Sequence, residues 1–306
     1  MARQPLRVET DLRGIHAILY ALFDAAERLD RAAMRRQAEL CLAAGVQGIG
    51  ALGLATEVPK LDAGERLQVM DWLAEDVAGK VPLFFTIFGA SVAEQVAQIR
   101  HAEAVGADWV ILQPPPVGSF SAAEYIAFYG RVAAATHLPV GIQNAPAYLG
   151  RGLSAGEIAE LVTKHPNIRC LKAEVSAVEV KQVIAATGGH VPVLNGRRGL
   201  ELIDNLEAGC AGLVVAPDLI DLEVAAYEHF AAGRKAEAGE AYARLLPAAC
   251  FIMHSPESLA CWGKRVFGLR AGIAVHDRAP ALRPTAFGLE LAKRHADRLG
   301  PLPSGR

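Results

Sequence analysis

The alternation of strand-like and helix-like segments constrains the fold of this chain more than any other feature of its sequence. Eight short apolar runs are predicted strands: Ile15–Phe23, Gly48–Gly53, Pro82–Phe88, Trp109–Pro114, Pro139–Asn144, Ile168–Glu174, Val191–Asn195 and Gly212–Ala216. Amphipathic stretches with helical spacing separate them: Asp30–Ala44, Asp62–Val77, Ser91–Val105, Ser121–Ala135, Ser154–His165, Ser176–Thr187 and Gly199–Ala208. Such an alternation predicts a parallel sheet, and eight strand–helix units predict its closure into a (β/α)8 TIM barrel.

An open, doubly wound sheet is the main alternative to the barrel. No Gly-x-Gly-x-x-Gly turn follows any predicted strand, which weakens a dinucleotide-binding interpretation. After Ala216 the pattern changes to helices alone, over Ile220–Ala232, Lys235–Met253, Pro256–Leu269 and Thr285–Leu299. We therefore expect an α/β chain with a barrel catalytic domain over residues 1–234 and a C-terminal helical extension, packed on the barrel, over residues 235–306.

The charge balance argues against nucleic acid or a membrane as the main partner. The 306 residues carry a formal net charge of −2, and no tract is rich in lysine or arginine. No run of about 18 apolar residues is present to span a bilayer, and Met1–Arg7 lacks the apolar core of a secretory signal. The 5 cysteines are scattered and fit a reducing compartment. We expect a cytoplasmic protein whose partner is a small molecule.

Lys172 interrupts a short, β-prone run that should be buried. A strand buried on both faces is expected to be almost entirely apolar, so a lysine there costs free energy. Burial disfavours the ammonium form, and the free amine is the species that attacks a ketone. Glu174 follows two residues later and should point to the same side of an extended strand. The pair suggests Schiff-base chemistry with an acid/base partner, and a structural ion pair or a lysine that reaches solvent from the strand end is the alternative.

Further polar residues fall at the C-terminal ends of the predicted strands, where a barrel of this type has its active site. Any one of them could be an ordinary loop residue, but their common position around Lys172 favours an active site. The candidate catalytic residues are Lys172, Glu174 and Gln143. The candidate substrate-binding residues are Thr56, Glu57, Gln113, Asn144, Asn195 and Arg197. Arg197 and Arg198 follow the seventh strand, where they either bind a distal carboxylate or face solvent.

Several short motifs follow one another along the chain. They are Gly53-Leu-Ala-Thr-Glu57, Gln113-Pro-Pro-Pro116, Ile142-Gln-Asn-Ala-Pro146, Leu171-Lys172, Asn195-Gly196 and Gly209-Cys-Ala-Gly212. From about Gly14 to the C-terminal helices, their order and spacing resemble the dihydrodipicolinate synthase / N-acetylneuraminate lyase superfamily of class I, Schiff-base-forming enzymes. The resemblance implies a TIM barrel, a 2-keto acid substrate, Lys172 as the Schiff-base lysine, and a homotetramer.

The chain departs from this family at the positions of the proton relay. The relay joins a threonine to two tyrosines, and by alignment those positions hold Leu54, Pro116 and Gln143. Leu54 and Ala55 replace two hydroxyls that would hold the substrate carboxylate, which leaves backbone N–H groups and Thr56. A dihydrodipicolinate synthase or a sialic acid lyase is therefore not expected.

Two further positions refine this comparison. Tyr148 occupies the place of the arginine with which dihydrodipicolinate synthase holds its second substrate. The segment Gln143–Pro146 together with Lys172-x-Glu174 is similar to the branch that contains 2-keto-3-deoxy-L-arabonate dehydratase, although Asn144 stands where that enzyme has aspartate. The resemblance is thus nearest to a sugar-acid dehydratase.

The groups present support dehydration of a 2-keto-3-deoxy sugar acid. Lys172 would attack the C2 ketone, and the iminium would act as an electron sink for loss of a C3 proton. The C4 hydroxyl would then leave as water, with Glu174 as the acid/base and the Gln143 amide holding a water or a substrate hydroxyl. The absent tyrosine hydroxyl counts more against retro-aldol cleavage, which must remove the C4 hydroxyl proton, than against dehydration.

Three alternatives stay open. A class I aldolase would use the same Lys172 and release pyruvate from a 2-keto-3-deoxy acid. A catalytically impaired, ligand-binding paralogue is made plausible by the three lost hydroxyls. A metal-dependent barrel lyase is weaker, because the 9 histidines form no ligand-spaced cluster with carboxylates. We expect no cofactor and no metal.

Overall fold

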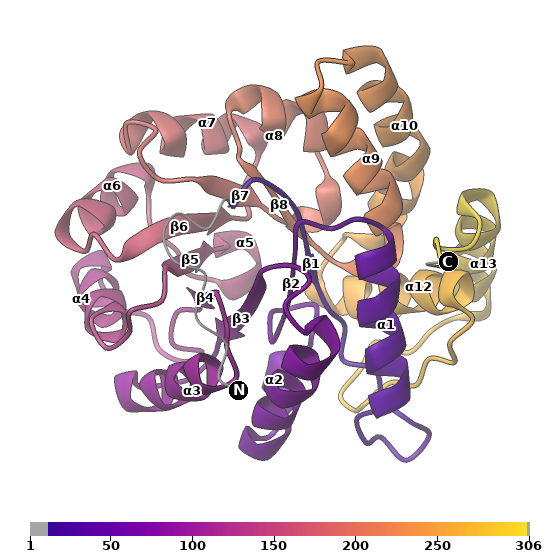
Figure 1. The fold of residues 1–306 in the computed structure, drawn as a ribbon, viewed down its shortest axis with the longest axis horizontal. Coiled ribbons are helices and arrows are strands. Elements are labelled where there is room, and N and C mark those ends of the chain that lie inside the picture. Colours follow the sequence, from indigo (N-terminus) through magenta and orange to yellow (C-terminus); the bar gives the residue numbers. More distant parts are fainter. Residues whose placement is uncertain (1–11, 305–306) are drawn as a thin grey trace.

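Eight parallel strands close into a barrel in the order in which they occur along the chain, as the alternation predicts (Figure 1). The computed structural model describes residues 12–304, so the expectation for Met1–Arg7 lies outside the described residues. The strands are β1 (Gly14–Ile18), β2 (Gly48–Ala51), β3 (Leu83–Ile87), β4 (Trp109–Leu112), β5 (Val140–Asn144), β6 (Ile168–Ala173), β7 (Val193–Asn195) and β8 (Gly212–Val215). The TIM-barrel fold class is confirmed, with β1 pairing with both β2 and β8.

Helices connect the strands and form the outer ring of the barrel (Figure 1). They are α1 (Arg31–Ala43), α2 (Ala63–Val77), α3 (Val92–Ala104), α4 (Ala122–Ala133), α6 (Ala155–Lys164), α7 (Ala177–Ala186), α8 (Leu202–Ala208) and α9 (Ile220–Ala231). The short helix α5 (Pro146–Leu149) follows β5 and lies inside this ring (Figure 1). Capping boxes mark the N-termini of several helices. At α6, the Ser154 hydroxyl accepts from the Glu157 backbone N–H, and the Glu157 carboxylate accepts from the Ser154 N–H. In the part of the chain that is described, no helix has the length and apolar character to cross a membrane.

The first predicted strand, Ile15–Phe23, is too long, because β1 ends at Ile18. The residues that follow are buried but find side-chain partners in place of a neighbouring strand. The Tyr20 backbone N–H donates to Gln37 Oε1 at 2.9 Å, and Gln37 Nε2 donates to the Tyr20 carbonyl at 3.0 Å. A single buried amide on α1 thus satisfies this backbone and allows it to leave the sheet.

The C-terminal extension contains α10 (Lys235–Ile252), α11 (Pro256–Ser258), α12 (Lys264–Ala271) and α13 (Ala286–Leu299). The predicted helix over Pro256–Leu269 is present and extends to Ala271, but the sequence did not indicate the π-helical turn at Leu259–Gly263 that lies between α11 and α12. At Gly263 an added Cβ would lie 2.2 Å from the Tyr20 hydroxyl, so the backbone passes close to the barrel there. The next residue, Lys264, is buried and reaches toward the end of β2. The division at residues 234 and 235 stays a prediction.

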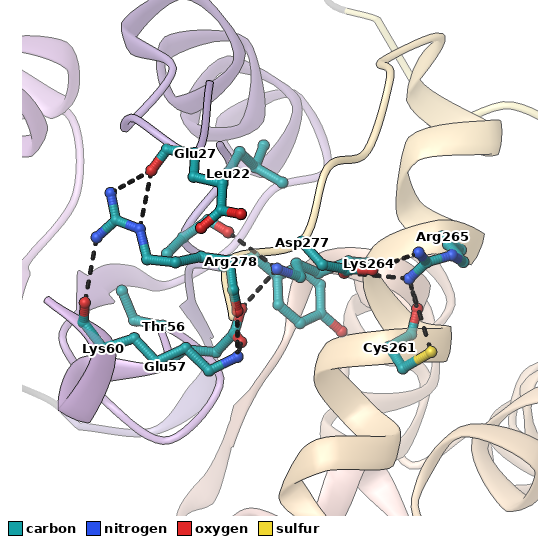
Figure 2. A network of polar contacts seen from close by, with 12 residues as sticks. Leu22, Glu27, Thr56, Glu57, Lys60, Cys261, Lys264, Arg265, Asp277 and Arg278 are labelled. Atoms are coloured by element: carbon teal, nitrogen blue, oxygen red, sulfur yellow. Dashed lines mark hydrogen bonds and ion pairs between the residues drawn. The ribbon is translucent and has the colours of Figure 1, made fainter. Parts of the chain in front are cut away.

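Residues 273–284, which we call the strap, connect α12 to α13 and cross the loop that follows β2. The Arg278 guanidinium donates to the Glu27 carbonyl at 2.9 Å, to the Lys60 carbonyl at 3.1 Å, and to the Glu65 carboxylate at 2.7 Å. Figure 2 shows Arg278 between Glu27 and Lys60. The strap is therefore fixed over the C-terminal end of the barrel, where it forms a wall of the site described next.

Candidate active site

Lys172 and Glu174 form a buried ion pair at the C-terminal end of β6. Lys172 lies in register with Gln143 of β5 and Leu194 of β7. Its Nζ is 2.7 Å from Glu174 Oε1, and the two side chains are 3% and 7% exposed. The spacing of two residues brings the carboxylate to the amine, as predicted. Since desolvating such a pair can cost more than its attraction returns, stability alone does not explain why it is there.

A small cavity of about 30 Å³, which we call the lysine pocket, lies beside this pair. The polar residues that line it are Tyr148, Lys172, Glu174, Arg197 and Arg198, and apolar residues such as Leu54 line the rest. A cavity of this volume has room for about one or two water molecules. A group bound here would therefore contact Lys172 and its neighbours at once.

A second cavity, of about 880 Å³, adjoins the lysine pocket, since Leu54, Tyr148 and Pro256 line both. The proline run at residues 114–116 and residues 279–282 of the strap contribute other walls. Its size falls within the range of about 300–1,000 Å³ that is typical of small-molecule sites. We call it the large cavity, and together with the lysine pocket it forms the candidate substrate site.

Gln113 and Gln143 meet at the ends of β4 and β5. Gln113 Nε2 donates to Gln143 Oε1 at 2.8 Å, and Gln113 lines the large cavity. Gln143 is 2% exposed, and its Nε2 has no hydrogen-bond partner among residues 12–304. An unpaired buried amide donor costs free energy, so a ligand oxygen would be a favourable partner.

Three of the predicted substrate-binding residues do not line either cavity. The Thr56 hydroxyl donates to the Leu19 carbonyl at 2.5 Å. The Asn195 amide donates to the Val175 carbonyl at 3.0 Å and to Asn205 Oδ1 at 2.7 Å. Each side chain thus satisfies a nearby buried group, and the prediction that it binds substrate is not supported by its position.

Asn144 is the third of these residues. Its Nδ2 donates to the Leu153 carbonyl at 3.0 Å, and its Oδ1 accepts from the Leu153 N–H at 2.8 Å. These two bonds close the loop that contains α5. Asn144 therefore shapes the site by fixing a loop, in place of the direct contact with substrate that we predicted.

Glu57 lines the large cavity but is already paired on both carboxylate oxygens. Lys264 Nζ lies 2.5 Å from Glu57 Oε1, and Lys60 binds Oε2. Figure 2 shows Glu57 between these two ammonium groups. Its carboxylate joins the loop after β2 to α12. Because both oxygens are paired with lysines, little capacity to accept a hydrogen bond from a substrate is left.

The two arginines after β7 have different surroundings. Arg197 Nη1 donates to Glu201 Oε2 at 2.7 Å, and its partly exposed side chain lines the lysine pocket. Arg198 is buried and binds Asp218 at 2.7 Å and Glu223 at 2.6 Å. Arg197 is therefore placed to meet a bound anion, whereas Arg198 is committed to a buried ion cluster and does not face solvent.

Tyr148 is the site residue that sequence reasoning missed. The sequence comparison marked it only as the replacement of an arginine, yet it comes from α5 and lines both cavities. Burial raises the pKa of its phenol, Arg197 lowers it, and Glu174 raises it, so both charged groups act on this hydroxyl. The position of the β5–α6 loop, which no local pattern gives, brings it there.

Within residues 12–304, no group of three or more His, Cys, Asp or Glu side chains is arranged to hold a metal ion. At the positions of the relay in the family that the motifs resemble, Leu54 and Pro116 line the large cavity, whereas Gln143 lines neither cavity and its buried amide contacts Gln113. The proton-transfer groups of this site are thus those around Lys172.

The model of the dihydrodipicolinate synthetase family matches residues 11–273. The chain belongs to this family. A DapA-like lyase of uncharacterized function from Halobacterium salinarum is 33% identical over 242 residues, covering 74% of this chain and 76% of the relative. L-2-keto-3-deoxyarabonate dehydratase from Azospirillum brasilense is 27% identical over 300 residues, covering 95% of each chain. The resemblance expected from the motifs is confirmed.

Solved structures agree on the fold of this family member. YagE, a prophage protein of the dihydrodipicolinic acid synthase family from Escherichia coli K12 solved in complex with pyruvate, superposes with a TM-score of 0.87 at 24% identity. The match covers 94% of this chain and 98% of YagE. The family consists of Schiff-base lyases, which makes this chain a lyase of that family.

Proposed function

We propose that this chain is a dehydratase of a 2-keto-3-deoxy sugar acid that works through a Schiff base on Lys172. The observation that carries the proposal is the Lys172–Glu174 pair, 2.7 Å apart and buried beside the lysine pocket. The Glu174 carboxylate lies within hydrogen-bonding distance of the amine, so it is placed to accept the proton that the amine must lose before it attacks a ketone. The dehydratase relative from Azospirillum brasilense supports the substrate class.

The proposed reaction assigns one task to each group. The Lys172 amine attacks C2 of the 2-keto acid, and the iminium draws electrons from C3 as Glu174 accepts the C3 proton. The C4 hydroxyl then leaves as water after it receives a proton. The unpartnered Nε2 of Gln143 supplies a hydrogen bond that orients a substrate hydroxyl. General acid–base help of this kind is typically worth ~10²–10⁴ in rate.

A class I aldolase is the second candidate, and the position of Tyr148 favours it. Cleavage of the C3–C4 bond needs a base for the C4 hydroxyl proton, and the relay tyrosines and threonine are absent from their usual positions. Tyr148 brings a phenol to the lysine pocket from another part of the chain. The two candidates share Lys172 and differ in the product, which is pyruvate for the aldolase and water plus a dehydrated keto acid for the dehydratase.

The test combines covalent trapping with product analysis. The protein is incubated with pyruvate, or with 2-keto-3-deoxyarabonate, in the presence of borohydride, and the adduct is located by peptide mass spectrometry. We expect labelling at Lys172 alone, and labelling elsewhere or none at all would instead indicate a ligand-binding paralogue. Assays for pyruvate and for the dehydrated product across a panel of 2-keto-3-deoxy sugar acids then separate the two lyases.

A further inference from the structure

The lysine pocket contains one group, beyond the Lys172–Glu174 pair, that can give and take a proton. Arg197 and Arg198 lie on its walls, but a guanidinium keeps its proton at any ordinary pH. The other side chains on its walls are aliphatic residues, one methionine and one proline. Among residues 12–304, the phenol of Tyr148 is therefore the remaining group on these walls that can transfer a proton.

Several contacts hold Tyr148 in this position. Tyr148 is on α5, a short helix that directly follows β5 and ends at Gly150 in the left-handed conformation. The Asn144 amide binds Leu153 through both its donor and its acceptor, which fixes the two ends of the loop. Arg151 donates to the Leu149 carbonyl at 3.0 Å and also binds the Pro115 carbonyl. The loop is thus tied both to β5 and to the segment after β4.

The charges around Tyr148 suit a proton donor. Burial and the nearby Glu174 carboxylate both raise the pKa of the phenol, so it holds its proton at neutral pH. The Arg197 guanidinium acts in the opposite direction and would stabilise the phenolate that exists briefly after the proton is given up. The group is therefore protonated when it is needed, with a cation beside it when it ionises.

We propose that Tyr148 is the catalytic acid that expels the C2 oxygen of the substrate as Lys172 forms its imine. This inference rests on the proposed Schiff-base function. The Lys172 ammonium first gives one proton to Glu174, and the free amine forms a bond to C2. Tyr148 passes protons from Glu174 to the C2 oxygen, which leaves as water when the C2–O bond breaks.

The protons and charges balance without any further reactant. Of the three protons on the Lys172 ammonium, one stays on the iminium nitrogen and two leave in the water. Glu174 returns to its carboxylate form, and Tyr148 ends as it began. The site thus holds a positive and a negative charge before and after the step.

The experiment measures the rate at which Lys172 is labelled by pyruvate. The full-length protein is incubated with saturating pyruvate and cyanoborohydride, and intact mass is followed with time for the parent, Tyr148→Phe and Tyr125→Phe. Tyr125 is a matched control, because it lies on α4 outside both cavities and its hydroxyl accepts only a weak bond from the Phe120 N–H at 3.4 Å. Thermal unfolding verifies that each variant is folded.

We expect Tyr148→Phe to label the same lysine about 10²-fold more slowly, as loss of a general acid does. Tyr125→Phe should label at the parental rate. Equal rates for Tyr148→Phe and the parent would overturn the role of Tyr148 and leave the Schiff-base function in place. A folded parent that is not labelled at Lys172 would overturn both.

Discussion

Two lysine–glutamate pairs are buried at the C-terminal end of the same barrel, and they differ in what surrounds the lysine. Lys264 is 1% exposed and lies 2.5 Å from Glu57, and Lys172 is 3% exposed and lies 2.7 Å from Glu174. Lys264 Nζ also approaches the Ala21 carbonyl at 3.4 Å and lies 5.1 Å from the centre of the Phe23 ring. Carbonyl, carboxylate and aromatic ring together enclose this ammonium.

Lys172 lacks such an enclosure. Within residues 12–304, Glu174 is its only ion-pair or hydrogen-bond partner, and the lysine pocket lies beside it. The same two residue types therefore make a closed structural bridge at one position and a pair with room for a ligand at the other. The comparison teaches that burial and pairing alone do not separate a structural lysine from a candidate nucleophile, and that a cavity beside an incompletely satisfied amine is the feature that distinguishes Lys172.

Replacing each lysine by methionine should separate the two roles, and the largest effect is expected at Lys172. Lys172→Met removes the proposed nucleophile, so the pyruvate adduct and all turnover should be lost, because no other lysine among residues 12–304 lines the lysine pocket. Lys264→Met serves as the matched control and should still be labelled at Lys172. Intact-mass spectrometry after borohydride trapping makes the measurement, and a parental adduct yield in Lys172→Met would show that the amine lies elsewhere.

The structural pair should show the next largest effect, on stability. Lys264→Met leaves Glu57 with one buried partner fewer and should lower the free energy of unfolding by about 3–5 kcal/mol, as breaking a buried ion pair does. The double variant Glu57→Gln/Lys264→Met should recover part of this loss, since the buried carboxylate, left in the single variant with Lys60 as its remaining partner, is then replaced by a neutral amide. Urea denaturation of the three proteins measures this, and a single variant as stable as the parent would contradict the structural role.

The sequence predicted the features that depend on short spacing. The strand–helix alternation gave the barrel, and two residues of separation on one strand placed Glu174 beside Lys172. The ion pair of Glu57 with Lys264 could not be predicted, because Lys264 is 207 positions away in the chain. No pattern within one segment could indicate that this carboxylate is already occupied.

The errors at polar residues have the same physical origin. Thr56 and Asn195 fall at strand ends, as active-site residues do, but their side chains satisfy backbone carbonyls at Leu19 and Val175. Tyr148 was overlooked because its place follows from a loop closed by Asn144. Local patterns thus located the site, while contacts made on folding decide which of its polar groups are free.

Within the Lys172–Glu174 pair, the proposed function predicts that Glu174→Gln reduces turnover by about 10²-fold, which corresponds to about 2.7 kcal/mol of transition-state stabilisation. The amide keeps the shape of the carboxylate but cannot carry a proton, so the adduct at Lys172 should form more slowly than in the parent and reach the same final yield. The equivalent change in the structural pair, Glu57→Gln, is the control and should affect stability more than turnover. A near-parental kcat for Glu174→Gln would make Lys172–Glu174 a second structural pair and remove the distinction.

The last prediction concerns a third buried cluster, in which Arg198 binds Asp218 and Glu223. Two carboxylates share one guanidinium, and Glu223 Oε2 has no hydrogen-bond partner among the described residues. Burial raises the pKa of Glu223 from 4.5 to about 7, although Arg198 opposes this shift. Like Lys264 and Glu57, these side chains are buried and paired with one another. The titration of Glu223 should therefore change the free energy of unfolding.

The sign of that dependence follows from which state binds the proton. Because the folded pKa of Glu223 lies above its unfolded value, the folded state holds the proton more tightly, and the stabilisation is complete below pH 4.5 and lost as pH rises through about 7. The glutamine of Glu223→Gln stays neutral in both states. The free energy of unfolding of this variant should therefore rise relative to the parent by about 1.4 kcal/mol per pH unit between pH 4.5 and about 7. Urea denaturation of both proteins from pH 5 to 8 measures the difference. A difference that does not change with pH would mean that Glu223 is ionised in the folded protein, and the cluster would then be held by charge pairing, like Lys264–Glu57.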